Sequence, residues 1–250
     1  MKPLILLSND DGVDAPGLEA LADAMAELGE VLVVAPERER SAVSHAITLH
    51  KPLRPKLRKL GWYSISGTPV DCVYTGILRL APRPPSLVVS GINDGHNLGS
   101  DVFYSGTAAA AVEGALRDVP SIAFSQAPGA NFAQSAKFAQ PLAARVLEHG
   151  LPSKCLLNVN FPREHGDKYR WTKLGQRVYR DQVDEREDLR GGTYYWIGGP
   201  TVAIDDVPDS DGETIKRGVV SVTPLRLDLT AHDMLDPVPS WTVQGYAPIE

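Results

Sequence analysis

The chain has 250 residues, of which 43% are hydrophobic and 22% charged, and these ordinary globular values exclude a mostly disordered protein. Its 25 basic and 31 acidic residues give a net charge of −6, which argues against a partner that is a nucleic-acid polymer. The two cysteines, Cys72 and Cys155, are too few and too far apart for a disulfide scaffold or a zinc site.

In the first half of the sequence, short apolar runs alternate with helical patterns. Buried strands are predicted at Pro3–Ser8 and Glu30–Ala35, and the helix Gly17–Leu28 between them is opened by Pro16 and closed by Gly29. The later elements are a strand near Trp62–Ser66, a helix from Pro69 to about Leu80, a strand at Leu87–Ser90, a helix from about Gly106 to Arg117, a strand at Ser121–Phe124 and a helix near Ala133–His149. This order predicts a parallel sheet that helices cover on both faces.

From about Ser153 the composition changes. The segment CLLNVNFP predicts one more core strand, and the chain then becomes richer in aromatic residues, Gly, Pro and charge, with short strands predicted at Tyr194–Ile197 and Val219–Thr223. We therefore expect an α/β core over residues 1–160 that holds the active site, and a β-rich extension over 161–250 that also returns in part to the core. Long extensions that cannot form their own core often pair with a second subunit, which favours a homo-oligomer.

The sequence contains no sign of a membrane partner. Its first residues, MKPLILLSNDDG, form an apolar stretch that is too short for a signal peptide, and no apolar run reaches the ~18 residues that a membrane span needs. We expect a soluble, cytoplasmic protein.

The first candidate site is the segment SNDDG at 8–12, directly after the first predicted strand. In open α/β sheets, ligands bind beyond the carboxyl ends of the strands, where the strand order reverses. The adjacent carboxylates of Asp10 and Asp11 repel each other, and a hard divalent cation such as Mg²⁺ or Mn²⁺ would relieve that repulsion. In the alternative interpretation, the aspartates cap a turn or a helix and Gly12 supplies a positive φ.

Other polar segments occur where the same edge of the sheet is predicted. SGINDGHNLG at 90–99 follows an apolar strand and would lie beside Asp10 and Asp11, unless it is a structural turn. SGTAAAA at 105–111 would open a helix whose free N–H groups favour a phosphate, and ordinary helix capping explains Ser105 nearly as well. Pro36–Thr48 by itself indicates a polar loop, and the basic run Lys51–Lys59 a solvated face.

Taken together, these segments resemble the survival protein SurE family of metal-dependent 5′/3′-nucleotidases. The resemblance covers essentially the whole chain, and the combination of SNDDG with SGIN and YSGT is highly specific. The matching segments are LLSNDDG at 6–12, VVAPERERSAVSHAITL at 33–49, SISGTPVDCVYTGI at 64–77, VVSGINDGHNLGSDVFYSGTAAAAVEGAL at 88–116, DLRGGTYYWIGGP at 188–200 and VSVTPLRLDLTAH at 220–232.

The resemblance implies a fold and an assembly. The fold is a Rossmann-like three-layer α/β/α core with a mostly parallel sheet and a C-terminal β-rich extension. Its hairpin and tail would be exchanged between the subunits of a dimer or tetramer. The residues that would hold the subunits together and support the site are Asp228 and His232.

The resemblance also implies the site residues. One divalent cation per subunit, Mg²⁺ or Mn²⁺, would be held by Asp10, Asp11, Ser41 and Asn93. The residues implied at the substrate and its phosphate are Asn9, Asn97, Ser105, Gly106 and Thr107. The pattern of residues alone would not have singled out Ser41.

This sequence departs from the family pattern at two places. Between Asn93 and Asn97 it carries Asp94 and His96, which would change the metal preference or the pH optimum, with His96 a candidate proton donor. We nevertheless expect both side chains to point to solvent. Ser210–Gly218 retains an aspartate but has GETIKR where apolar residues are usual, which leaves its packing open.

The reaction that the resemblance implies is hydrolysis of nucleoside 5′- and 3′-monophosphates, with short polyphosphate as a further candidate substrate. Asp10, Asp11, Asn97 and Ser105 would be catalytic, with Asp10 orienting or deprotonating the attacking water. One alternative makes Asp10 a covalent nucleophile, although aspartyl-phosphate enzymes usually space two aspartates one residue apart. The other is a metal-dependent nucleotide sensor without catalysis.

Overall fold

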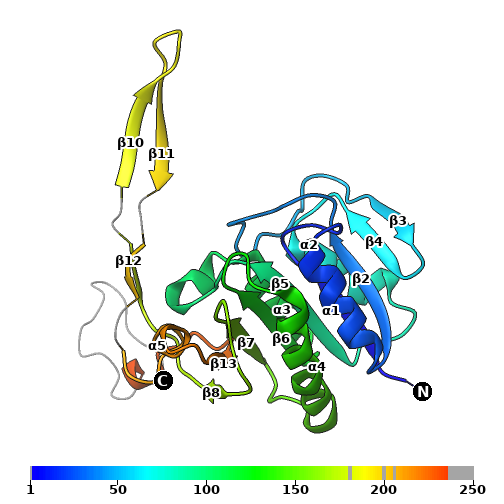
Figure 1. The fold of residues 1–250 in the computed structure, drawn as a ribbon. Coiled ribbons are helices and arrows are strands. Elements are labelled where there is room, and N and C mark those ends of the chain that lie inside the picture. Colours follow the sequence, from blue (N-terminus) through cyan, green and yellow to red (C-terminus); the bar gives the residue numbers. More distant parts are fainter. Residues whose placement is uncertain (1, 180–181, 199–200, 205–206, 236–250) are drawn as a thin grey trace, which may run out of the picture.

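A nine-stranded sheet forms the centre of the computed structural model, which describes residues 2–179, 182–198, 201–204 and 207–235 (Figure 1). The strands lie in the order β3-β4-β2-β1-β5-β6-β7-β13-β8. Their bounds are β1 Leu4–Ser8, β2 Glu30–Pro36, β3 Pro55–Lys59, β4 Trp62–Ile65, β5 Leu87–Asp94, β6 Ser121–Gln126, β7 Cys155–Phe161, β8 Tyr169–Trp171 and β13 Val220–Arg226. The six strands from β4 to β7 in this order are parallel, so the predicted Rossmann-like α/β fold is confirmed.

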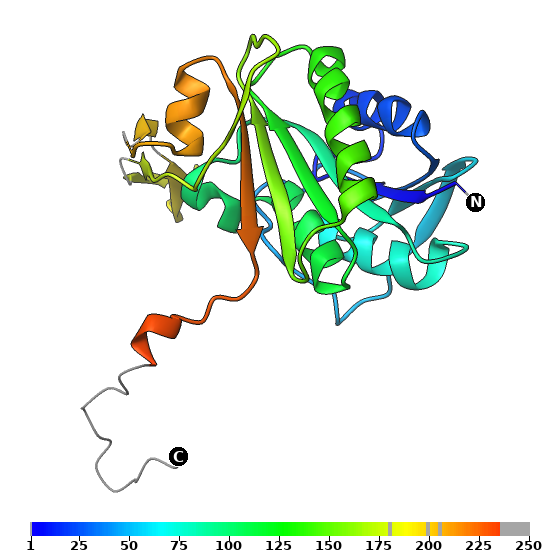
Figure 2. The same ribbon diagram turned by 90° about the horizontal axis from the view of Figure 1, so that it is seen from below.

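Two pairs of helices cover the two faces of the sheet. The helices α1 (Pro16–Ala26) and α4 (Phe132–His149) pack on one face, and α2 (Pro69–Thr75) and α3 (Gly106–Leu116) pack on the other (Figures 1 and 2). Successive side chains of a strand point to opposite faces, so β1 contributes Ile5 and Leu7 to the first core and Leu4 and Leu6 to the second. Burial on both faces favours a continuous apolar run such as LILL in β1, which is why this strand could be predicted.

The order of strands reverses between β1 and β5. The chain proceeds from β1 to β2 and β4 on one side, and then from β5 to β6 and β7 on the other. The loops that follow β1 and β5 therefore diverge and leave a crevice at the carboxyl edge of the sheet. This crevice is where the predicted polar segments meet.

The C-terminal part both rejoins the sheet and leaves it. Strand β13 pairs antiparallel with β7, and β8 pairs with β13. The hairpin of β10 (Gln182–Glu187) and β11 (Thr193–Gly198) projects away from the core, and β9 (Arg177–Tyr179) pairs with β12 (Thr201–Ile204) at its base (Figure 1). After β13 the chain leaves the sheet again toward the short 3-10 helix η3, His232–Met234 (Figure 2). The domain division at residue 160 stays a prediction, and the last part of the expected exchanged tail lies outside the described residues.

Two of the elements that the sequence did not predict, β3 and α5 (Asp211–Lys216), lie in segments that the sequence analysis had singled out. The second half of the basic run is β3, an exposed strand at the edge of the sheet, so the run is solvated as expected but has regular structure. The GETIKR segment lies within α5 and the residue after it; the hydroxyl of Ser210 caps this helix by accepting the N–H of Glu213 at 3.1 Å.

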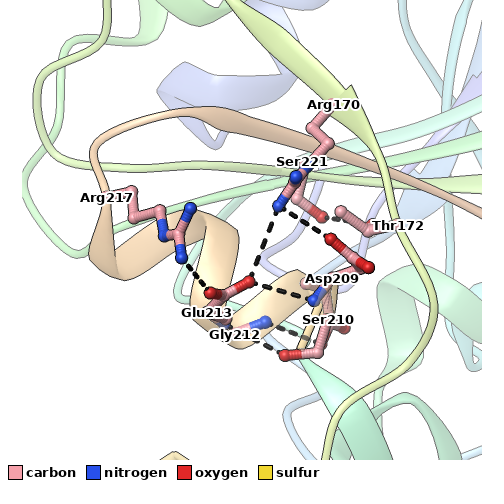
Figure 3. Close-up of polar contacts among 9 residues, drawn as sticks. Arg170, Thr172, Asp209, Ser210, Gly212, Glu213, Arg217 and Ser221 are labelled. Carbon is pink, nitrogen blue, oxygen red and sulfur yellow. Dashed lines mark hydrogen bonds and ion pairs between the residues drawn. The ribbon is translucent and has the colours of Figure 1, made fainter. Parts of the chain in front are cut away.

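Ion pairs explain how the unusual composition of α5 is accommodated. The Glu213 carboxylate pairs with Arg217 and with Nη1 of Arg170 on β8, which lies 3.6 Å from its Oε2 (Figure 3). The same Arg170 nitrogen is 3.1 Å from Oδ1 of Asp209. Polar contacts at the surface thus attach α5 to β8, while Ile215 supplies the buried apolar contact.

Candidate active site

The crevice between β1 and β5 contains a cavity of about 310 Å³. Its lining residues are Asp10, Asp11, Glu39, Ser41, Ala42, Asn93, Asp94, Asn97, Asp101, Tyr104 and Ser105. The structure therefore brings together all four expected metal ligands and two of the expected phosphate-binding residues. A cavity of this size, with several convergent polar groups, is typical of a site for a small ligand.

Asp10 is the most buried carboxylate of the cavity, with 6% of its surface exposed. Burial raises its pKa, although the Thr107 hydroxyl, which donates to its Oδ1, and the N–H groups of Gly106 and Thr107 act in the opposite direction. The first turn of α3 is thus directed at the Asp10 carboxylate. Gly106 permits this approach, because a Cβ atom at that position would lie 2.7 Å from Cβ of Asp10.

Asp11 shares the unfavourable environment of its neighbour. Burial, and then the negative charge of Asp10, raise the pKa of Asp11 to about 6, against the opposing effect of the Asp94 N–H group. Both carboxylates are therefore costly to ionise in the protein alone, and a cation between them would offset that cost.

The remaining oxygen atoms fit a hard divalent cation. The Ser41 hydroxyl donates to Oε1 of Glu39 at 2.5 Å, so its lone pairs are left for a ligand. The amide nitrogen of Asn93 donates to the Gly95 carbonyl at 2.8 Å, which leaves its side-chain oxygen as the ligand atom. In the part of the chain that the structure describes, no three His, Cys, Asp or Glu side chains are grouped to hold a metal, so a cation here would need these neutral oxygens and water as well.

Contacts far apart in the sequence hold the loop that carries Ser41. Its neighbour Arg40 donates its backbone N–H to the Asp10 carbonyl at 2.7 Å. Ser44 donates its hydroxyl to the Phe103 carbonyl at 2.6 Å and its N–H to the Tyr104 carbonyl at 3.1 Å. The loop is thereby fixed against both the turn after β1 and the segment before α3, which is what brings Ser41 to the cavity.

Asn97 is held by a buried polar network that the sequence analysis missed. Its amide nitrogen donates to Ser125 Oγ at 2.7 Å, and its N–H donates to Oδ1 of Asn160 at 2.9 Å. The Asn97 carbonyl accepts from Asn158 and Asn160 at 2.9 and 3.0 Å. The signal was present in LLNVNF, where two asparagines alternate with apolar residues in a strand predicted to be buried.

Two of the expected substrate residues also have structural roles. Asn9 is fully buried, and its side chain binds both the N–H and the carbonyl of Gly12, whose φ is +106°. The turn after β1 is therefore held by Asn9, which leaves both aspartate side chains to the cavity. Ser105 lines the cavity and also caps α3 by accepting the Ala108 N–H at 3.0 Å.

The other expected residues lie apart from the cavity or at its edge. Asp228 and His232 pair with each other at 2.6 Å in the exposed segment after β13, so their support of the site stays a prediction. Asp94 is exposed as expected and accepts the Gly129 N–H at 2.9 Å. The expectation for His96 is wrong, because its ring is partly buried and its Nε2 lies 2.8 Å from the Phe161 carbonyl.

The Asp11 environment predicts a gain of stability on mutation. In the metal-free protein, Asp11→Asn should raise the free energy of unfolding at pH 7 by about 1–2 kcal/mol, once solvent screening of this partly exposed group is allowed for. Because the folded-state pKa of about 6 lies above the ordinary aspartate value of about 4, the wild type should lose stability as the pH rises from about 4 to 6. Urea unfolding with chelator at pH 4 and pH 7 measures the difference, and equal stability at both pH values would contradict it.

The fold and the cavity define a class: Rossmann-like α/β proteins with an acidic small-ligand site, suited to a hard cation, at the point where the strand order reverses. Comparison with known proteins identifies the family within this class. The family model described as survival protein SurE matches residues 5–181. The chain belongs to the SurE family.

Individual relatives match the chain over nearly its full length. The chain is 53% identical over 249 residues to the 5′-nucleotidase SurE of an Anaeromyxobacter species, with 97% of each chain covered. It is 49% identical over 245 residues to the 5′-nucleotidase SurE of Geotalea daltonii, covering 96% of this chain and 99% of the relative. The crystal structure of the SurE protein from Aquifex aeolicus superimposes with a TM-score of 0.84 at 39% identity, over 94% of this chain and 98% of that one.

Proposed function

We propose that this protein is a metal-dependent 5′-nucleotidase that hydrolyses nucleoside monophosphates to a nucleoside and inorganic phosphate. The observation that carries the proposal is the pair of adjacent carboxylates, Asp10 and Asp11, in one cavity with Asn97 and Ser105. The names of relatives that match 97% of the chain support it, and they do not favour the alternative of a sensor without catalysis. Nucleoside 3′-monophosphates and short polyphosphate are further candidate substrates.

One divalent cation per subunit, Mg²⁺ or Mn²⁺, belongs to this proposal. Asp10, Asp11, Ser41 and Asn93 would hold it, because all four line the cavity and carry the oxygen atoms that a hard cation prefers. When bound, such a cation neutralises charge on the phosphoryl group and lowers the pKa of a coordinated water molecule.

The side chains of the chain itself supply the rest of the chemistry. Asp10 orients the attacking water and accepts its proton as the new P–O bond forms. Asn97 and the Ser105 hydroxyl bind the phosphate oxygens and align the phosphorus with that water. As the bond to the nucleoside oxygen breaks, that oxygen takes a proton from solvent and leaves as a hydroxyl group, and Asp10 returns its proton to solvent.

Phosphate release is the direct test of this function. Protein stripped with chelator is given Mg²⁺, Mn²⁺ or Zn²⁺ together with a panel of nucleoside 5′- and 3′-monophosphates. We expect inorganic phosphate to appear with added metal and to be absent without it. Folded protein that releases no phosphate with any of these metals would overturn the proposal, and tight nucleotide binding without release would favour the sensor.

We propose further that the protein is a dimer or tetramer joined through its C-terminal hairpin and tail. The proposal is supported by a run of exposed side chains on β11, where Tyr195, Trp196 and Ile197 are 61%, 61% and 89% exposed. An isolated two-stranded hairpin is at best marginally stable in water, and exposed apolar patches of this kind usually mark a site of contact with a partner chain.

The oligomer has its own test. Replacing Trp196 and Ile197 together by lysine should reduce the assembly to the monomer mass of 27.0 kDa in analytical ultracentrifugation, because the charges would be buried at the interface. Leu60→Lys is the matched control, since Leu60 is 96% exposed in the turn between β3 and β4. A wild type that sediments as a monomer, or a double variant that stays assembled, would contradict the proposal.

We propose that the protein is located in the cytoplasm. Cys72 and Cys155 are both free thiols, as a reducing compartment favours. In the described part of the chain, the structure has no helix with the length and apolar character needed to cross a bilayer.

A further inference from the structure

An exposed aromatic residue, Tyr104, lines the cavity proposed as the active site. Tyr104 comes directly before Ser105, at the end of the 3-10 helix η2 (Gly99–Phe103). It is 67% exposed, yet it lines the same cavity as Asp10, Asp11 and Ser105. Tyr104 thus lies beside the residues proposed to bind the phosphate, and most of the residue's surface is open to solvent.

The backbone beneath this ring is fixed from two sides. The Tyr104 carbonyl accepts the Ser44 N–H at 3.1 Å, and its N–H donates to the Asp101 carbonyl at 2.9 Å. The Ser44 hydroxyl binds the preceding carbonyl, that of Phe103, at 2.6 Å. The ring therefore projects from a rigid support, which reduces the conformational entropy that a ligand must remove when it packs against it.

We infer that the Tyr104 ring is the platform on which the base of a bound nucleoside monophosphate stacks, an inference that rests on the proposed function. In a nucleoside monophosphate the ribose separates the base from the phosphate by several bonds. A nucleotide whose phosphate lies at Ser105 can therefore place its base beside the neighbouring residue, Tyr104. Stacking on an aromatic ring needs no particular hydrogen-bonding pattern, because every base has a π-face. A site built this way accepts purine and pyrimidine nucleotides and discriminates against phosphate esters that lack a base.

The test compares a substrate that has a base with one that lacks it. The substrates are adenosine 5′-monophosphate and ribose 5-phosphate, and the variants are Tyr104→Ala and Tyr104→Phe. For Tyr104→Ala we expect KM for the nucleotide to rise about tenfold or more, with kcat changed little and kcat/KM for ribose 5-phosphate within about twofold of the wild type. Tyr104→Phe keeps the ring and should keep the wild-type KM.

Phe103→Ala is the matched control, because Phe103 is 63% exposed on the same segment but does not line the cavity. If Phe103→Ala raised KM for the nucleotide alone and Tyr104→Ala did not, the assignment of the stacking platform to Tyr104 would be overturned. An equal loss for both substrates in Tyr104→Ala would overturn the stacking role, since it would indicate a structural one. A wild type that hydrolyses both substrates with equal kcat/KM would overturn the inference and leave the proposed function standing, whereas release of phosphate from neither would overturn the function itself.

Discussion

Asp10→Asn should lower kcat/KM for nucleoside monophosphates by on the order of 10³-fold at saturating metal. The amide cannot accept a proton from water and binds a cation more weakly, and loss of a positioned general base alone costs about 10²–10⁴-fold. The change keeps the shape of the side chain, and its oxygen can still accept from the Thr107 hydroxyl. Phosphate release by the purified variant, with circular dichroism to confirm folding, measures the effect.

Asp23→Asn is the control for this prediction, because Asp23 is an exposed aspartate of α1 and should behave as the wild type. Full activity of Asp10→Asn with excess metal would contradict the role given to Asp10. The assay also separates the covalent alternative: acid-quenched wild type that carries phosphate on Asp10 would show attack by the carboxylate rather than by water.

The parts of the site that could be predicted are those on strand ends. Leu4–Ser8 and Leu87–Ser90 are recognisable as buried strands from their apolar runs, and the polar residues that come next in the sequence must meet at the carboxyl ends of the parallel strands. Asp10, Asp11 and Asn93 reach the cavity for this reason. Local sequence was enough because the sheet itself positions them.

The residues that the patterns did not reveal depend on long-range contacts. Ser41 reaches the cavity because its loop binds Asp10, Phe103 and Tyr104, and nothing in PERERSAVSHAIT indicates those partners. Only the family resemblance singled out Ser41 beforehand. Helix α5 was missed because it is six residues long and polar, so its stability depends on Arg170 and on Ser210 rather than on an apolar face.

Asn158 and Asn160 were missed for a different reason. A continuous buried strand was predicted correctly, but a buried polar side chain must find partners, and this requirement is itself a signal. Both side-chain amides donate to the Asn97 carbonyl, and the side-chain oxygen of Asn160 accepts the Asn97 N–H, so β7 positions a residue of the site although it contributes no side chain to the lining of the cavity. Alternating asparagines in an otherwise apolar strand therefore indicate that the strand holds a neighbouring loop through side-chain hydrogen bonds.

The close contact between α3 and Asp10 makes Gly106→Ala the second prediction with a large effect. The added Cβ would lie 2.7 Å from Cβ and 2.9 Å from Oδ2 of Asp10, so one of the two segments must shift. Alanine is the better helix former, and the variant should therefore stay folded while the carboxylate moves. Displacement of a catalytic group by about 1 Å can cost about 10²-fold, and we expect kcat to fall by roughly that factor.

Kinetics and thermal unfolding together separate this effect from a general loss of structure. Gly166→Ala is the control, since a Cβ at Gly166 meets no atom within 4 Å and should change neither quantity. A Gly106→Ala variant with wild-type kcat would show that Asp10 tolerates displacement, and so would contradict its role in activating water. A fall in kcat with an unchanged melting temperature would instead mean that the glycine is needed to position the Asp10 carboxylate and not to stabilise the fold.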